Sequence, residues 1–421
     1  MFARSCRLLL LAFAMLALPG VAHASTARVE GMTLPGDYLK DYTGIYTYVS
    51  GVSSVGNLIY GELGDQRASG VNADRGVGAV LGNLWDGRWG TWAIHLRQQT
   101  PGLGAGDTSS AYPGTLGGDP NSHTNETFDL MWGRRFGTTA LGVRLNRSFF
   151  RNEDELVGVT TNLEYDVASG GDPTLARNII GLALGAGLEI NPNATLEVAL
   201  HSQDRTFEQL IAGTTYTEDG GSTWLASARL LWQWQPNLLV VPVAKFYTYD
   251  LSTATTPPGG PTAVQDNSLS GWEAGIAGNW TIGSNDLFVL GMAFAQNTVD
   301  QQADLFGLST AFGVGADAKI TETLLPQVFA ALETNINSWL TLRMGAQKGT
   351  FNSLKVEDDV NGETVTISSS PFVMNIGAGV KLGPLQLDAV LRGDFPQTLG
   401  GWFSNTANYV AFPKVSATYG F

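Results

Sequence analysis

The last thirteen residues constrain the possible fold more than any other stretch. From Tyr409 to Phe421 every second residue is apolar, and the positions between them include Lys414, Ser416 and Thr418. Successive side chains of a β-strand point to opposite faces, so this period of two predicts a strand with one apolar and one mixed face. The chain ends directly on an aromatic residue. The alternative for this stretch alone is the terminal strand of a soluble β-protein.

This stretch resembles the final strand of bacterial outer-membrane β-barrel proteins. In that class the last strand ends in Phe and carries alternating apolar residues, which the barrel-insertion machinery reads. The resemblance implies that Tyr419 and Phe421 form an insertion signal. It also implies outer-membrane lipid and the insertion machinery as partners.

The amino terminus predicts a secretory signal peptide over residues 1–24. Arg4 and Arg7 give a basic start, Leu8 to Leu18 an apolar run, and Ala22-His23-Ala24 a small-residue cleavage site, with cleavage expected after Ala24. This run is too short for a membrane-spanning helix, and no later window holds the roughly 18 apolar residues that one needs. The leader therefore predicts export, and the resemblance of the last strand implies the outer membrane of a Gram-negative-type bacterium as the destination.

Composition narrows the class of protein. The sequence carries a formal net charge of -14, only 15% charged residues and 52 glycines. Nucleic-acid affinity comes largely from Lys and Arg on phosphates, so an acidic chain excludes that role. Soluble domains usually hold about 25% charged residues. The only cysteine, Cys6, lies in the predicted leader, so we expect no disulfide and no cysteine metal ligand in the mature chain.

Two kinds of connection alternate between the segments with a period of two. Short turns such as Asn191-Pro192-Asn193-Ala194 contain Asn, Asp, Gly or Pro. Asp86-Gly87 predicts a two-residue hairpin between strands at Gly76–Trp85 and Arg88–Arg97. The other connections are long loops, at 98–123, 151–176, 204–222, 250–269, 299–322, 352–370 and 396–408. This alternation is typical of membrane barrels with short periplasmic turns and long extracellular loops.

The pattern predicts an all-β fold: a transmembrane antiparallel up-and-down β-barrel over residues 55–421. Counting the segments gives about 16 strands, or about 14 if the first segments belong to a plug, and 305–319 has room for two more. Each predicted strand is about 9–13 residues long, which suits a tilted membrane crossing. Residues 25–54 show no clear strand and predict a lead-in or possible plug.

The faces opposite the apolar ones would line the barrel interior. Their charged residues are of both signs, as in pores whose charged rings tune the passage of solutes. The alternative for any single residue is a structural ion pair across the interior. The pore-lining candidates are Arg97, Asp129, Arg144, Glu197, Arg229, Lys245, Glu273, Glu333, Arg343, Lys381, Asp388 and Arg392.

Catalysis is disfavoured by the few histidines. His201 and Ser202 are adjacent in a predicted strand, so they point to opposite faces and cannot act together. No His, Cys and Asp spacing matches a zinc site. We therefore expect no enzyme activity, no catalytic residue, no metal and no cofactor.

Two regions resemble the long-chain fatty-acid outer-membrane transporter family. They run from Leu325-Pro326-Gln327-Val328 through Trp339 to Gly345, and from Gly377-Ala378-Gly379-Val380 through Gly383 to Asp388. That family has an amino-terminal plug with an Asn-Pro-Ala signature, and this tripeptide does not occur here.

Two functions therefore remain open. One is a channel or transporter for passive passage of small solutes or hydrophobic molecules. The other is a barrel with a closed lumen whose loops act as adhesin, receptor or assembly partner. Solute identity and oligomeric state are left open.

Overall fold

The computed structural model describes residues 25–64, 75–82, 87–97, 126–153, 174–211, 213–220, 223–283, 286–302, 317–358, 360–391 and 412–421. The predicted signal peptide, Arg392 and most of the stretch 305–319 lie outside these residues.

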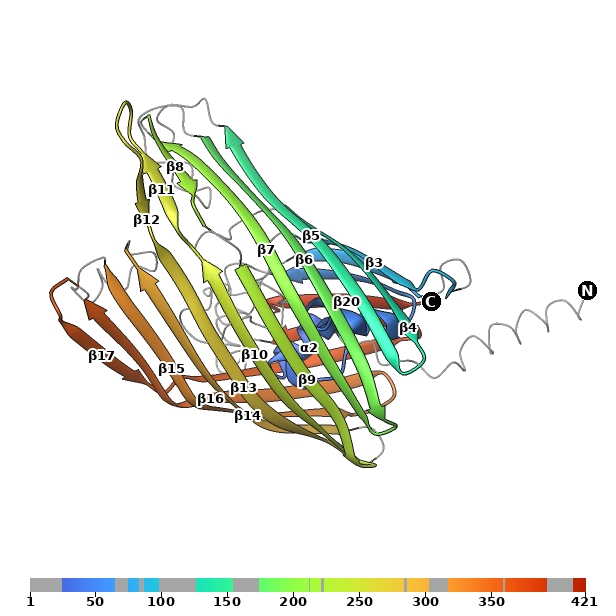
Figure 1. Ribbon diagram of the computed structural model, residues 1–421. Helices are drawn as coiled ribbons and strands as arrows, with labels where there is room; N and C mark the ends of the chain where they lie inside the picture. Colours follow the sequence, from blue (N-terminus) through green and yellow to red (C-terminus); the bar gives the residue numbers. More distant parts are fainter. Residues whose placement is uncertain are drawn as a thin grey trace, which may run out of the picture.

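Sixteen strands form a closed antiparallel barrel (Figure 1). Each strand pairs with its two neighbours, and the first strand pairs with the last, Leu58 opposite Gly420, which closes the ring. The predicted barrel of about sixteen strands is confirmed. The strands are β1 Leu58–Gly64, β2 Gly76–Leu81, β3 Thr91–Arg97, β4 Glu126–Phe136, β5 Thr139–Glu153, β6 Thr174–Asn191, β7 Ala194–Ile211, β9 Thr223–Gln235, β10 Leu238–Asp250, β13 Asn267–Ile282, β14 Asp286–Gln301, β15 Ala318–Asn335, β16 Leu340–Asp358, β18 Phe372–Leu382, β19 Leu385–Leu391 and β20 Lys414–Gly420.

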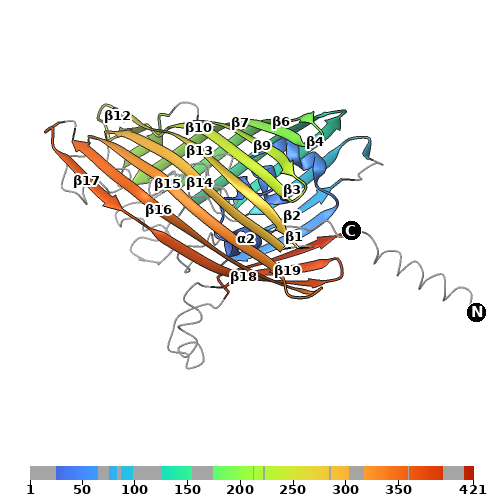
Figure 2. The ribbon, with the colours of Figure 1, turned by 90° about the horizontal axis from the view of Figure 1, so that it is seen from below.

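The barrel has a short-turn end and a long-loop end. At the short-turn end, two-residue connections such as Gly137-Thr138 and Gly383-Pro384 join β4 to β5 and β18 to β19. At the long-loop end four further strands extend the sheet: β8 Thr214–Glu218, β11 Thr253–Thr256, β12 Ala263–Gln265 and β17 Thr364–Ser369 (Figures 1 and 2).

Three predicted loops were therefore partly wrong. The ranges 204–222, 250–269 and 352–370 contain the ends of long strands and these four additions. β8 and β11 are rich in Thr, whose branched side chain suits a pleated surface, and they pair with each other beyond the barrel wall. Strand lengths were also underestimated, since β16 contains 19 residues.

The first hairpin also differs from its prediction. β2 ends at Leu81 and β3 begins at Thr91, with Leu81 opposite Trp92, so the connection is longer than the predicted two-residue turn. Gly90 has a φ of +76°, and the Trp89 carbonyl accepts hydrogen bonds from the indole nitrogens of Trp92 and Trp132. Gly90 therefore has a left-handed backbone conformation that a β-strand does not contain, and β3 begins only after it, at Thr91.

The carboxy-terminal strand has the predicted faces. Lys414, Ser416 and Thr418 point inward and are fully buried, whereas Tyr419 is 44% exposed on the outer wall. The Tyr419 and Phe421 rings stack with centroids 6.4 Å apart. The outer wall elsewhere carries exposed large apolar side chains, including Leu184, Trp234 and Ile276, as a surface that meets hydrocarbon would.

Residues 25–54, called here the luminal segment, lie inside the barrel (Figures 1 and 2). The segment consists of α2 Thr26–Gly31 and three short 3-10 helices, η1 Gly36–Tyr38, η2 Tyr42–Tyr46 and η3 Val49–Ser54. Helix α2 contacts β16, β18, β19 and β20, and η3 contacts β3 to β7. No helix in the described ranges is long and apolar enough to cross a membrane.

The outer wall gives the first testable prediction. Ile276 is 46% exposed in the middle of β13, and Ser268 is exposed on the same face near the long-loop end. We expect Ile276→Arg to lower the free energy of unfolding in lipid vesicles by about 2–4 kcal/mol, and Ser268→Arg by about 0–1 kcal/mol. Urea titration followed by tryptophan fluorescence measures both. Equal effects at the two positions would contradict a lipid-facing wall.

Candidate functional site

Apolar side chains of the luminal segment fill the short-turn half of the interior. Val29, Met32 and Leu34 belong to one buried cluster with Val241 and Phe329 of the wall. A second cluster joins the segment to the opposite wall and consists of Tyr42, Ile45, Tyr46, Val49, Val52, Leu58, Tyr60, Val80, Ala93, Met131 and Ala183. Every member is at most 7% exposed. Burial of this apolar area stabilises the seated segment.

Inward-facing glycines let the backbone of the segment approach the wall. A Cβ at Gly142 would lie 2.3 Å from the Val49 carbonyl oxygen, and one at Gly345 would lie 1.6 Å from the Met32 carbonyl oxygen. Gly185 similarly faces the Ser50 amide nitrogen at 2.9 Å. No side chain fits at these positions without movement, so the wall is shaped to the main chain of the segment.

Lys245 on β10 joins the segment to the wall by charge. Its Nζ donates to Asp37 of the segment and lies 3.6 Å from Glu273 of β13. The Tyr38 hydroxyl donates to Glu273 Oε1 at 3.0 Å. All these side chains are buried, so each charge depends on its partner for compensation.

Two arginines of the wall hold backbone carbonyls of the segment. Arg229 pairs with Glu197 at 2.6 Å and donates to the carbonyl oxygens of Asp37 and Leu39 at 3.0 and 2.9 Å. Arg144 pairs with Asp129 at 2.8 Å and donates to the Tyr46 carbonyl oxygen at 3.1 Å. The guanidinium places several donors in a fixed plane, which suits it to hold a carboxylate and a carbonyl together.

A third network surrounds α2. Arg28 makes a bidentate contact with Glu333, at 2.7 and 2.8 Å, and Glu333 also binds Arg343. Arg343 continues to Asp388, which accepts a hydrogen bond from Ser25. Lys414 on the last strand pairs with Glu30 at 3.0 Å. Bidentate, charge-assisted contacts are among the stronger hydrogen bonds, so α2 is fixed in orientation as well as position.

Burial shifts the ionisation of groups within the segment. It raises the pKa of the Asp41 carboxyl, against the opposing effects of Arg28 and Thr43. Burial, together with Glu273, also raises the pKa of the Tyr38 phenol well above its ordinary value. Burial alone would lower the pKa of Arg28, but the carboxylates of Glu333, Asp41 and Asp388 together outweigh it and raise this pKa.

Most of the predicted pore-lining residues face the interior. Lys381 lies next to the short turn at Gly383 and is exposed there, and Arg392 is outside the described residues. Whether the set lines a solute path stays a prediction, because several members bind the segment. Those that are inward and buried are Arg97, Asp129, Arg144, Glu197, Arg229, Lys245, Glu273, Glu333, Arg343 and Asp388.

Sequence reasoning missed the partners of these residues. Asp37, Arg28 and Glu30 lie in a stretch without strand periodicity, so nothing in the pattern placed them against the wall. The wall glycines that contact the main chain of the luminal segment gave a weak signal in the sequence. Gly133, Gly142 and Gly185 occupy inward positions on three neighbouring strands, where glycine has no side chain to contribute to packing.

A second apolar layer lies toward the long-loop end. It faces the interior on β9, β10 and β13–β16, beyond Lys245 and Glu273, and none of its described members belongs to the luminal segment. The layer contains Leu225, Tyr247, Tyr249, Leu251, Leu269, Val299, Ala318, Ile320 and Val356, each at most 1% exposed. These apolar side chains are buried and are interleaved with inward polar residues of the same strands, such as Asn297 and Glu322.

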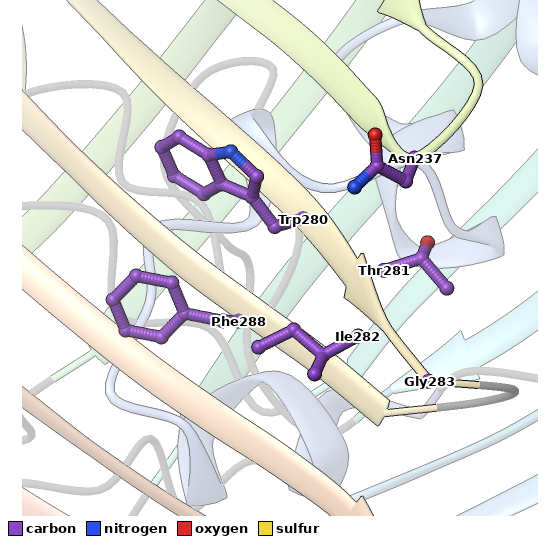
Figure 3. Close-up of a pocket in the computed structure, with 6 residues that line it drawn as sticks. All are labelled: Asn237, Trp280, Thr281, Ile282, Gly283 and Phe288. Atoms are coloured by element: carbon purple, nitrogen blue, oxygen red, sulfur yellow. The ribbon is translucent and has the colours of Figure 1, made fainter.

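Two other features lie apart from this arrangement. His201 Nε2 contacts the Thr47 carbonyl oxygen at 2.8 Å and so takes part in holding the segment. A surface depression beside the short turn of β13 and β14 is lined by Trp280, Ile282 and Phe288 on the outer wall (Figure 3). Within the described part of the chain, no group of three His, Cys, Asp or Glu side chains is placed to hold a metal.

The glycine seats give a prediction. Gly142→Ala would place a methyl group against the Val49 carbonyl, whereas Gly61→Ala on β1 would meet nothing within 4 Å. Overpacking of this kind costs about 1–3 kcal/mol. We expect Gly142→Ala to lower the thermal midpoint and to make the luminal segment sensitive to protease in detergent, with Gly61→Ala as the control. Equal behaviour of the two variants would contradict a tight seat.

The contact of Lys245 with Asp37 and Glu273 gives a further testable prediction. Lys245→Met leaves Asp37 and Glu273 facing each other without their cation, and loss of one partner of a buried pair costs about 3–5 kcal/mol. Lys319→Met is the control, because the side chain of Lys319 is 47% exposed and lies 3.8 Å from Asp300, a pair worth about 0–1 kcal/mol. Urea unfolding in detergent compares them, and equal losses would refute the proposed importance of Lys245.

Comparison with known proteins yields similarity at low identity only. No protein-family model matches the chain, and no curated protein matches it in sequence. The chain is similar to BauA, the ferric preacinetobactin receptor from Acinetobacter baumannii, at 10% identity and a TM-score of 0.45, over 79% of this chain and 53% of that one. It thus spans about half of the length of BauA.

Two further solved structures match over most of their own length. For the TodX monoaromatic hydrocarbon channel the identity is 8% and the TM-score 0.34, over 87% of this chain and 88% of that one. For the Ralstonia pickettii toluene transporter TbuX the identity is 10% and the TM-score 0.33, over 87% of this chain and 89% of that one. At these identities and TM-scores, the function has to be argued from the chain's own residues.

Proposed function

We propose that the protein is an outer-membrane channel or transporter for passive passage of small solutes, in which residues 25–54 act as a plug. The observation that carries the proposal is the non-covalent seat of the luminal segment inside a closed barrel, made by Lys245, Arg229 and Arg144. Export through a leader cleaved after Ala24, and recognition of Tyr419 and Phe421 by the insertion machinery, belong to the same proposal.

The second apolar layer supports solutes with apolar surface. Tyr249, Leu269 and their neighbours lie between the long-loop end and the charged groups at Lys245, and because they are buried, a molecule from that end contacts them only when the residues that cover them move. Ligand sites are mostly apolar with a few polar groups that fix orientation. We therefore propose a small hydrophobic molecule, with no covalent chemistry and no cofactor, as the transported class.

Passage to the short-turn end requires part of the luminal segment to move. The charged contacts give such a movement a defined cost, because each one broken exposes or strands a buried charge. A solute shifts this equilibrium only by as much as it binds the displaced state better than the seated state. The seat thus keeps the barrel closed in the absence of solute.

The closed interior also favours a second candidate. The luminal segment is buried against the wall around the barrel, and β8, β11, β12 and β17 extend the sheet beyond it. A barrel that stays closed would act through this extension as a receptor, adhesin or assembly partner. The two candidates differ in whether the segment moves.

A disulfide that locks the segment separates them. A Cβ at Gly187 would lie 3.6 Å from the Ser50 Cβ, within the range of about 3.5–4.5 Å that a disulfide needs. In Ser50→Cys with Gly187→Cys we expect oxidation to block passage and reduction to restore it. The measurements are ion conductance in planar bilayers and uptake of the apolar dye N-phenyl-1-naphthylamine by intact cells.

The single variants Ser50→Cys and Gly187→Cys control for the substitutions themselves. Passage that is equal in the oxidised and reduced protein would show that the segment does not gate the path. Absence of passage in the wild type and in the reduced double variant would support the closed-barrel candidate instead.

A further inference from the structure

The luminal segment begins at the place where the barrel closes. Ser25 is fully buried, and its Oγ donates to Asp388 Oδ2 at 2.7 Å. The Thr26 amide donates to Glu62 Oε1 at 3.3 Å, and the Ala27 amide donates to Ser416 Oγ at 3.3 Å. These partners lie on β19, β1 and β20, three neighbouring strands that include the first and the last. The closing strands therefore hold the first three described residues.

Buried charged groups of both signs surround this point. The described groups joined by hydrogen bonds or ion pairs around α2 include three cations, Arg28, Arg343 and Lys414. The carboxylates in the same contacts number five: Glu30, Asp41, Glu62, Glu333 and Asp388. Buried charge is costly unless nearby groups compensate it. A positive group beside the carboxylates of Asp388 and Glu62 would add to that compensation.

Processing of the chain creates such a group. Hydrolysis of the Ala24–Ser25 peptide bond adds the hydroxyl of a water molecule to the Ala24 carbonyl carbon and a hydrogen to the Ser25 nitrogen, which then takes up a proton. That nitrogen is three bonds from the Ser25 Oγ that contacts Asp388. In the unprocessed chain the same nitrogen is a neutral amide.

We infer that the mature protein keeps its α-ammonium group inside the barrel, bound between the carboxylates of Asp388 and Glu62. The inference rests on the proposed cleavage after Ala24 and is independent of the proposed transport. Cleavage then has a structural role besides release from the leader, because it supplies a positive charge beside two buried carboxylates.

The test is the reactivity of this amine. The protein is purified from outer membranes, its first residue is established from its mass and amino-terminal peptides, and it is treated with 2-pyridinecarboxaldehyde, which modifies α-amines in their neutral form. A nearby carboxylate favours the charged amine, and each unit of pKa lowers the neutral fraction tenfold. We expect Ser25 as the first residue and labelling at least about tenfold slower in the folded than in the urea-unfolded protein.

Two variants separate ion pairing from simple burial. Asp388→Asn and Glu62→Gln keep the shape of each side chain and remove its charge, so each should speed labelling of the folded protein by about tenfold. Asp300→Asn is the control, because its side chain is 60% exposed on β14, and it should change nothing. If Asp388→Asn does not fold, since Asp388 also binds Arg343, Glu62→Gln decides.

Three results would overturn the inference. They are a first residue other than Ser25, equal labelling of folded and unfolded protein, and protection that persists unchanged in the foldable charge-removing variants. None of these measurements involves passage of a solute. Failure of transport with the expected labelling would count against the proposed function alone, and unprotected labelling of a chain that begins at Ser25 would count against the inference alone.

Discussion

Every backbone amide and carbonyl that meets hydrocarbon must find its partner within the protein, and the rest of this structure depends on that constraint. A closed ring of antiparallel strands meets it, because the pairing of β1 with β20 removes the last free edge. Closure also divides the side chains of each strand between lipid and interior. Apolar residues such as Ile276 can then face outward while Glu273, three positions away, faces inward.

This division of side chains places charged residues in the barrel interior, where they must be compensated. Charged side chains that are kept from lipid are also largely kept from water, so each needs a partner close by. The luminal segment supplies many of them, with Asp37 at Lys245, main-chain carbonyls at Arg229 and Arg144, and Arg28 at Glu333. The luminal segment thus compensates the buried charges of the wall and also packs its apolar side chains in the interior.

The wall was predictable because it depends on local periodicity. The alternation of apolar and polar residues around Trp272 and Glu273 determines which face of the strand is apolar. The repeated short turns join the strands into hairpins and so predict an even number of strands. The exact strand ends were not predictable, since β8 and β11 are short strands defined by their pairing with β7, with β12 and with each other beyond the wall. Lys381 shows the limit of periodicity alone, because its face is inward by alternation but its position at a turn leaves it exposed.

The seat of the luminal segment was beyond reach for a different reason. Its contacts join residues hundreds of positions apart, as in the pair Ala27 and Ser416, separated by 389 positions. A short stretch of sequence never contains both partners, so its residue pattern cannot reveal their contact. The same separation dictates an order of assembly. β20 supplies Lys414 and Ser416 to the binding place of α2, so that place is complete only once the strand synthesised last has joined the sheet, whereas the strands that hold η3, β3 to β7, precede it in the chain.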